Sequence, residues 1–407
     1  MAPIRGGRCQ YGVLSRMSRP ADRPETAVAH SRARAPGVDG VRALAVMAVV
    51  LFHEGIRGVP GGFLGVDVFF VLSGYLITDI LLTRHAGSSG LDLNGFWIRR
   101  ARRLLPALIA MLATVTAVVT VVNPGQLGEL RPALVAAALY GSNWFQILHD
   151  VPYFDSFGPL PPLQHLWSLA VEEQFYFVWP FVLGWIVLPL RGRPARAVIA
   201  LSAAAASALL LATLYQPGED PSRVYYGTDT RAMALLIGAS LAIVWPLARL
   251  TGASQRFARR LDVIGVGGLL ILVWAFSYFS GTTPSLYPGG LIAVACASGA
   301  LIAAAAAPGR MGTLLGWTPL RWLGIRSYGI YLWHWPVIAL TPTLTDMDAD
   351  TPWMWVAQTV VTIALAAVSW RWVEQPILRD GFRTTFRSIY HCLTGPGAGS
   401  WRPPVRF

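Results

Sequence analysis

The first long apolar run places an arginine and a histidine where they could act together inside a membrane. The run reads GVDGVRALAVMAVVLFHEG, with Arg42 and His53 eleven residues apart. Eleven steps of about 100° return to one helix face, and the rise between the two residues is about 16 Å. Asp39 shares that face with Arg42. Arg42 is therefore expected near the cytoplasmic mouth, and His53 deep in the outer half.

The second apolar run, FLGVDVFFVLSGYLIT, contains Asp67 about as far after the Gly/Pro turn as His53 lies before it. In an antiparallel hairpin the two side chains share a depth. A contact between them would fix the tautomer of the imidazole, with His53 as a general base and Asp67 as its orienting carboxylate. Spacing alone leaves open a structural alternative, in which both are buried groups that satisfy other polar groups.

Four arginines precede the third apolar run, in the segment FWIRRARRLLPAL. The planar guanidinium fork suits phosphate groups, so a cytoplasmic donor that carries phosphates is expected to dock here. Taken alone, the cluster is better explained as the positive charge that keeps a loop on the cytoplasmic side. The four residues are Arg99, Arg100, Arg102 and Arg103.

Two later runs, LQHLWSLAVEEQFYFVWP and SYGIYLWHWPV, each present a polar face. Polar residues inside apolar runs are expensive in a membrane and are candidates for function. The residues that share a face are His165, Ser168 and Glu172 in the first run, and Ser327, Tyr331 and His334 in the second. Glu173 points about 100° away from its neighbours on the first helix.

The composition identifies an integral membrane protein. Of the 407 residues, 54% are hydrophobic and 13% are charged, and the mean hydropathy is +0.49. A soluble domain carries about 25% charged residues. Eleven apolar runs are candidate spans, each about 18 residues or longer. They lie near 40–57, 63–82, 104–122, 132–148, 166–189, 196–214, 229–248, 262–279, 288–306, 327–343 and 353–372.

The arginines between these runs predict the topology. The net charge of +12 comes from arginines in loops, which is typical of membrane topology rather than nucleic-acid binding. With both termini cytoplasmic, the alternation of sides holds only if 132–148 does not cross. We therefore predict about ten transmembrane helices, with 124–165 as a re-entrant or surface segment on the outer side.

The domain organisation follows from the same pattern. Residues 1–36 are expected to form a disordered basic cytoplasmic tail, 37–380 the membrane domain, and 381–407 a second basic cytoplasmic tail. The three cysteines are scattered, so they indicate neither a disulfide framework nor a metal site.

With these segments in place, the chain resembles the acyltransferase-3 family of integral membrane O-acyltransferases. The matching motifs occur in the family's order, cover roughly residues 37–380, and are specific as a set rather than singly. They are GVDGVRALAV with His53, FFVLSGYLIT, RRARRLLPA, HLWSLAVEEQFYFVWP, SYGIYLWHWP and WRWVEQP.

The resemblance implies a bacterial plasma-membrane enzyme without a permanently bound cofactor. It would transfer an acyl group, commonly acetyl, from cytoplasmic acyl-CoA to a hydroxyl of a cell-surface polysaccharide, lipid-linked saccharide or macrolide. The family's essential arginine and histidine fall on Arg42 and His53, and the glutamate of its WSL-x-x-E motif on Glu172. Its arginine pair falls within 99–103, where we choose Arg99 with Arg102 or Arg103.

Roles can then be assigned. The predicted catalytic residues are His53, Glu172 and Asp67, and the predicted CoA-binding residues are Arg42, Arg99, Arg102 and Arg103. The predicted substrate-binding residues are His165, Ser168, Glu173, Tyr331 and His334. Some relatives carry an esterase-like domain after the last helix. This chain ends about 27 residues after the resemblance stops, so a second step is expected to be absent or supplied by a separate extracytoplasmic enzyme.

The main alternative is a proton-coupled transporter or flippase of a sugar or lipid, in which the histidines and glutamates relay protons. The lack of an obvious internal repeat argues mildly against it. A catalytically inactive relative that serves as a receptor is disfavoured by the intact Arg42, His53 and Glu172.

Overall fold

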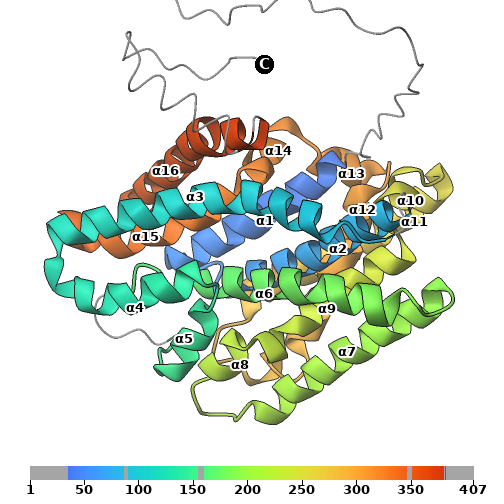
Figure 1. Cartoon of the computed structure of the whole chain (residues 1–407), viewed down its shortest axis with the longest axis horizontal. Coiled ribbons are helices and arrows are strands. Elements are labelled where there is room, and N and C mark those ends of the chain that lie inside the picture. The colour runs from blue at the N-terminus through green and yellow to red at the C-terminus, as the bar shows by residue number, and fades with distance from the viewer. Residues whose placement is uncertain (1–34, 87–89, 155–159, 346–350, 380, 382–407) are drawn as a thin grey trace, which may run out of the picture. The chain divides into compact units, whose positions relative to one another are not determined.

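The computed structural model describes residues 35–86, 90–154, 160–345, 351–379 and 381. These residues form helices joined by turns and include no strand, which confirms the predicted all-α fold (Figure 1). The two predicted tails lie almost entirely outside the described residues. Pro36, assigned to the first tail, is already the first residue of a helix.

The longer helices carry the predicted apolar runs. They are α1 (Pro36–His53), α2 (Gly65–His85), α3 (Leu93–Val122), α6 (Leu166–Val182), α7 (Arg193–Leu214), α9 (Thr228–Val244), α11 (Gln255–Tyr278), α12 (Gly290–Ala306), α15 (Ser327–Thr345) and α16 (Pro352–Ser369). The shorter helices are α4 (Leu127–Ala138), α5 (Ser142–Leu148), α8 (Ser222–Tyr226), α10 (Leu247–Thr251), α13 (Arg310–Leu315) and α14 (Thr318–Ile325). Single turns of other helix types are η1 (Gly62–Leu64), η2 (Pro124–Gln126), η3 (Leu183–Val187), η4 (Pro284–Leu286) and η5 (Trp370–Glu374).

Six of the described helices are long and apolar enough to cross a bilayer: α1, α2 with η1, α3, α7, α11, and α16 with its extension to Arg379. The chain is therefore an all-α integral membrane protein. Four further helices of 17 to 19 residues, α6, α9, α12 and α15, carry the remaining predicted spans. The total of ten spans stays a prediction.

The segment 124–165 departs from the regular pattern, as the sequence predicts. The left-handed backbone of Tyr140, with φ of 52°, separates α4 from α5. These two helices have 12 and 7 residues, whereas a spanning helix needs about 20. The irregular backbone after α5 carries Tyr153, which reaches His53 at the end of α1. A non-spanning segment thus lines the interior of the bundle.

Small residues allow two helices of the bundle to approach closely. A Cβ atom at Gly74 in α2 would overlap the carbonyl oxygen of Leu235 in α9, and one at Gly238 would overlap that of Val71. Close contacts of this kind are typical of helix packing in membranes. They fix how α2 is rotated against α9, and hence which polar groups of the two helices meet.

Candidate active site

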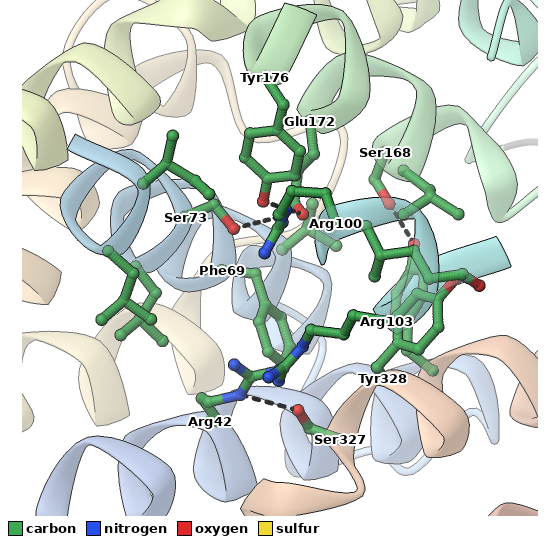
Figure 2. Close-up of a pocket in the computed structure, with 17 residues that line it drawn as sticks. Arg42, Phe69, Ser73, Arg100, Arg103, Ser168, Glu172, Tyr176, Ser327 and Tyr328 are labelled. Carbon is green, nitrogen blue, oxygen red and sulfur yellow. Dashed lines mark hydrogen bonds between the residues drawn. The ribbon is translucent and has the colours of Figure 1, made fainter. Parts of the chain in front are cut away.

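A cavity of about 740 Å³ lies among α1, α2, α3, α6 and α15 and is partly open (Figure 2). Its walls are apolar except for a set of charged and hydroxyl side chains. These polar residues are Arg42, Ser73, Arg100, Arg103, Ser168, Glu172, Tyr176, Ser327, Tyr328 and Tyr331.

Three guanidinium groups dominate the cavity. Arg42 and Arg103 point toward each other from α1 and α3, and Arg100 reaches the side formed by α6 (Figure 2). Arg42 Nε donates to Ser327 Oγ at 3.1 Å, and the Arg100 guanidinium lies 4.1 Å from the centre of the Tyr176 ring. These contacts hold the arginines in place while their charges remain directed at the cavity.

Glu172 is the only carboxylate in the described lining of this cavity. Its Oε1 accepts from Ser73 Oγ and its Oε2 from Tyr176 Oη, both at 2.9 Å. Among the described ion pairs within 4.0 Å, none joins Glu172 to an arginine of the cavity. Three positive charges against one negative charge leave an excess that suits an anionic ligand.

The rotation of α3 decides which arginines face the cavity. Arg100 and Arg103 are three residues apart and share a face. Arg99 pairs instead with Asp92 at 3.2 Å, with their side chains 43% and 56% exposed. Arg102 also lies outside the lining. Of the arginines expected to bind CoA, Arg42 and Arg103 therefore line this cavity and Arg99 and Arg102 do not, while Arg100, which the sequence-based choice omitted, lines it too.

A cluster of three histidines lies at the other end of α1. His53 Nδ1 is 3.1 Å from His334 Nε2, and the rings of His334 and His165 have centres 5.6 Å apart. Trp335 covers His53 with a ring-centre distance of 4.7 Å. Within the described residues, no group of histidine, cysteine or acidic side chains is placed to hold a metal ion. The contacts of these histidines are instead hydrogen bonds.

For neutral rings, the hydrogen-bond network assigns a tautomer to His334 and to His53. His334 Nδ1 lies 2.6 Å from the carbonyl oxygen of Tyr331, which can only accept, so this nitrogen carries the proton. His334 Nε2 is then an acceptor, and His53 Nδ1 donates to it. His53 Nε2 is left unprotonated, with the Tyr153 hydroxyl donating to it at 3.3 Å. His53 therefore presents a basic nitrogen inside the protein.

The polar faces of α6 and α15 connect the arginine cavity to the histidine cluster. The two helices are antiparallel, so the residues of their polar faces meet in pairs. Ser168 Oγ and Tyr331 Oη are hydrogen-bonded, and Tyr331 Oη also donates to the His165 carbonyl oxygen at 2.9 Å. The Tyr331 ring centre is 5.2 Å from that of His334. Glu173 lies outside the lining of the cavity, consistent with its different direction on α6.

The predicted contact between His53 and Asp67 is wrong. Asp67 Oδ1 accepts from Arg231 Nη2 of α9 at 2.8 Å, and both side chains are fully buried. The Arg231 guanidinium also lies 4.7 Å from the centre of the Tyr225 ring. The close packing of α2 on α9 turns Asp67 toward Arg231. His334 occupies the orienting position that Asp67 was expected to fill.

We expect Asp67→Ala to destabilise the protein, because it leaves the buried charge of Arg231 without its partner. Breaking a buried ion pair costs about 3–5 kcal/mol of unfolding free energy. Thermal and denaturant unfolding in detergent measures this loss, and the double variant Asp67→Ala/Arg231→Met should recover part of it. A normal unfolding midpoint combined with a lost reaction rate would contradict a structural role for Asp67.

Two residues of the site had weak or absent signals in the sequence. Tyr153 lies in irregular backbone between α5 and α6, where no periodicity marks a functional position. Arg100 could have been selected together with Arg103 from their spacing alone. Ser327, which the sequence placed on the face of Tyr331, proves to be the hydrogen-bond partner of Arg42.

The sequence profile of the acyltransferase domain family matches residues 36–371. The chain belongs to the acyltransferase-3 family. This confirms the resemblance that its motifs indicated. The family match covers both the arginine cavity and the histidine cluster, since every residue of these two sites lies between 42 and 335.

Several acyltransferase-3 relatives are similar to the chain. The peptidoglycan O-acetyltransferase OatA of Listeria monocytogenes is 42% identical over 91% of this chain and 61% of its own length. The O-acetyltransferase OatA of Staphylococcus aureus is 35% identical over 86% of this chain and 58% of its own. YrhL of Bacillus subtilis is 44% identical over 87% and 56%. The chain thus spans 56–61% of the length of these relatives. No solved structure matches it.

Proposed function

We propose that this protein is a bacterial plasma-membrane O-acetyltransferase that uses acetyl-CoA to acetylate a saccharide hydroxyl, with peptidoglycan as the leading acceptor. One observation carries the proposal: a cavity with three arginines reaches the Ser168–Tyr331 pair, and the Tyr331 ring lies 5.2 Å from that of His334, which hydrogen-bonds His53. The names of the OatA relatives support the acetyl group and the cell-wall acceptor.

The arginines would bind the phosphates of CoA. Guanidinium groups bind phosphate oxygens in a bidentate manner, and Arg42, Arg100 and Arg103 converge on one space. The termini of the chain would be cytoplasmic, which gives this cavity access to the donor. Along α1, His53 lies about 16 Å beyond Arg42, a separation that an extended pantetheine arm would bridge.

The reaction would take place between Tyr331 and His53. His53 Nε2 would remove the proton from the acceptor hydroxyl, whose oxygen attacks the thioester carbonyl. The carbon–sulfur bond then breaks, and the CoA thiolate leaves and takes up the proton from His53. The Ser168 and Tyr331 hydroxyls would donate hydrogen bonds to the carbonyl oxygen as it gains negative charge, after turning away from each other and from the His165 carbonyl oxygen.

A covalent route would use the same nitrogen. His53 Nε2 would attack the thioester and carry the acetyl group, and the acceptor hydroxyl would then displace it. Both routes require the tautomer that His334 imposes on His53. Trapping of an acetylated protein with labelled acetyl-CoA in the absence of acceptor distinguishes them.

The proposal is tested with the purified full chain in lipid nanodiscs. Acetyl-CoA labelled in the acetyl group is supplied with a panel of saccharide acceptors, and label is followed into saccharide products. Label in a saccharide ester together with release of CoA thiol is the expected result. Proton-coupled flux of a saccharide without consumption of thioester would instead favour the transporter.

Replacing Arg100 or Arg103, which line the cavity from α3, should weaken the binding of acetyl-CoA more than replacing the exposed Arg99. We expect Arg100→Ala and Arg103→Ala each to raise the KM for acetyl-CoA about 10- to 100-fold, the effect of losing a charge-assisted hydrogen bond. Arg99→Ala is the matched control on the same helix and should change this KM less than about twofold. Equal effects at all three positions would contradict the assignment of the cavity to the donor.

A further inference from the structure

A second cavity, of about 640 Å³, lies where α3 ends, between α4, α5 and residues 160–164. Its polar lining differs in chemistry from that of the arginine cavity. The polar side chains belong to Gln126, Glu129, Ser142, Gln146 and Gln164. The described lining includes one carboxylate and no arginine or histidine. Such a surface disfavours phosphates and suits a neutral ligand that donates hydrogen bonds.

Two buried amides belong to the lining of this cavity. Gln146 and Gln164 are 5% and 3% exposed. The Nε2 of Gln146 donates to the Gln164 carbonyl oxygen at 2.7 Å, and the Nε2 of Gln164 donates to the Pro152 carbonyl oxygen at 2.9 Å. These bonds fix the orientation of both amides. Each Oε1 is buried without a partner among the described residues.

Buried acceptors of this kind are unfavourable unless a donor reaches them. Sugar hydroxyls are donors of the right type, and they would reach the two oxygens once side chains of the cavity wall shift to uncover them. The amides are already ordered by their bonds to the backbone, so they would bind a ligand with little further loss of conformational freedom.

This cavity shares its wall with the histidine cluster. Gln164 directly precedes His165, and the carbonyl oxygen of Pro161 accepts from Trp335 Nε1 at 2.8 Å. The Trp335 ring in turn lies 4.7 Å from that of His53. A ligand held by Gln164 would therefore lie close to Trp335, which packs on His53, in a cavity that shares no described lining residue with the arginine cavity.

We propose that this second cavity binds the acceptor, as a neutral sugar ring whose hydroxyls donate to Gln146 and Gln164. The assignment rests on the proposed acetyltransferase function and gives the acceptor a site of its own, separate from that of the donor. A glycan strand and a lipid-linked saccharide present the same chemistry.

Filling the cavity tests the proposal without removing a polar group. Ala133 of α4 lines the cavity, whereas Val135 on the same helix is 60% exposed. The probe is a β-1,4-linked tetrasaccharide of N-acetylglucosamine, either free or attached to a polyprenyl diphosphate. We expect Ala133→Trp to raise its KM at least about tenfold and to change the KM for acetyl-CoA less than twofold. Val135→Trp should change neither.

A polar variant gives an independent measure. Gln146→Met removes the acceptor oxygen and should raise the KM for the tetrasaccharide about two- to tenfold, the effect of one hydrogen bond. Gln174 is the matched control, because its amide bonds Tyr140 and Asn143 and lies outside the cavity. Gln174→Met should leave that KM unchanged, and unfolding midpoints identify variants that fail to fold.

The outcomes separate the two proposals. Suppose that the wild type transfers acetyl groups but folded Ala133→Trp and Gln146→Met have an unchanged KM for the tetrasaccharide. This result would overturn the acceptor site and would leave the acetyltransferase function in place. If the wild type consumes no thioester, the function fails, and direct calorimetric binding of the tetrasaccharide decides the site. If the wild type binds the tetrasaccharide and Ala133→Trp does not, the acceptor site is supported. If the wild type does not bind it, the acceptor site is overturned. Preference for one form of the probe identifies the source of the sugar.

Discussion

Replacing His53 with alanine is expected to lower the rate of acetyl transfer about 10²- to 10⁴-fold, the usual contribution of a general base. The unprotonated Nε2 of His53 is the basic nitrogen of the histidine cluster, and alanine provides no substitute. The loss should appear in kcat, because the arginine cavity that would bind CoA does not include His53.

The measurement compares wild type and His53→Ala in nanodiscs with labelled acetyl-CoA. CoA should raise the thermal unfolding midpoint of both proteins equally, which shows that the variant is folded and binds the donor. His149→Ala is the matched control, since His149 is an exposed histidine after α5 and should keep full activity. Undiminished transfer by folded His53→Ala would eliminate both the general-base and the acyl-histidine routes.

The second large effect is expected at His334, which acts through His53 as a positioning residue. Its Nε2 accepts the proton of His53 Nδ1 and so keeps Nε2 of His53 basic. Without an acceptor at this position the proton can move to the other nitrogen of His53. We expect His334→Leu to lower the rate about 10²- to 10⁴-fold, as loss of an orienting partner does in catalytic triads.

A conservative variant separates positioning from packing. In His334→Gln the side-chain amide oxygen can accept from His53 Nδ1, so this variant should recover at least about tenfold of the rate lost in His334→Leu. The pH profile of kcat provides a second readout, because the midpoint of its acidic limb, where His53 becomes protonated, should move in His334→Leu and return toward wild type in His334→Gln. Equal losses in the two variants, with an unchanged pH profile, would reduce His334 to a packing residue.

Most of the fold and part of the site followed from the sequence. The apolar runs became helices, and the Pro-rich segment 124–165 became the short α4 and α5, because hydrophobicity and helix-breaking residues act locally. The polar faces of α6 and α15 were also correct. Residues three or four apart share a helix face whatever the helix packs against, so Ser168 and Tyr331 could be placed on the polar faces of their helices in advance.

The sequence by itself determined the membrane fold, the family motifs and the separation of Arg42 from His53 along one helix. Only the tertiary structure decided which side chains meet. His53 bonds His334, 281 residues away, and Asp67 bonds Arg231, 164 residues away. The physical reason is that a partner depends on how each helix is rotated and which helix lies beside it. Those choices come from close packing, such as that of Gly74 and Gly238, and not from the periodicity of any single segment.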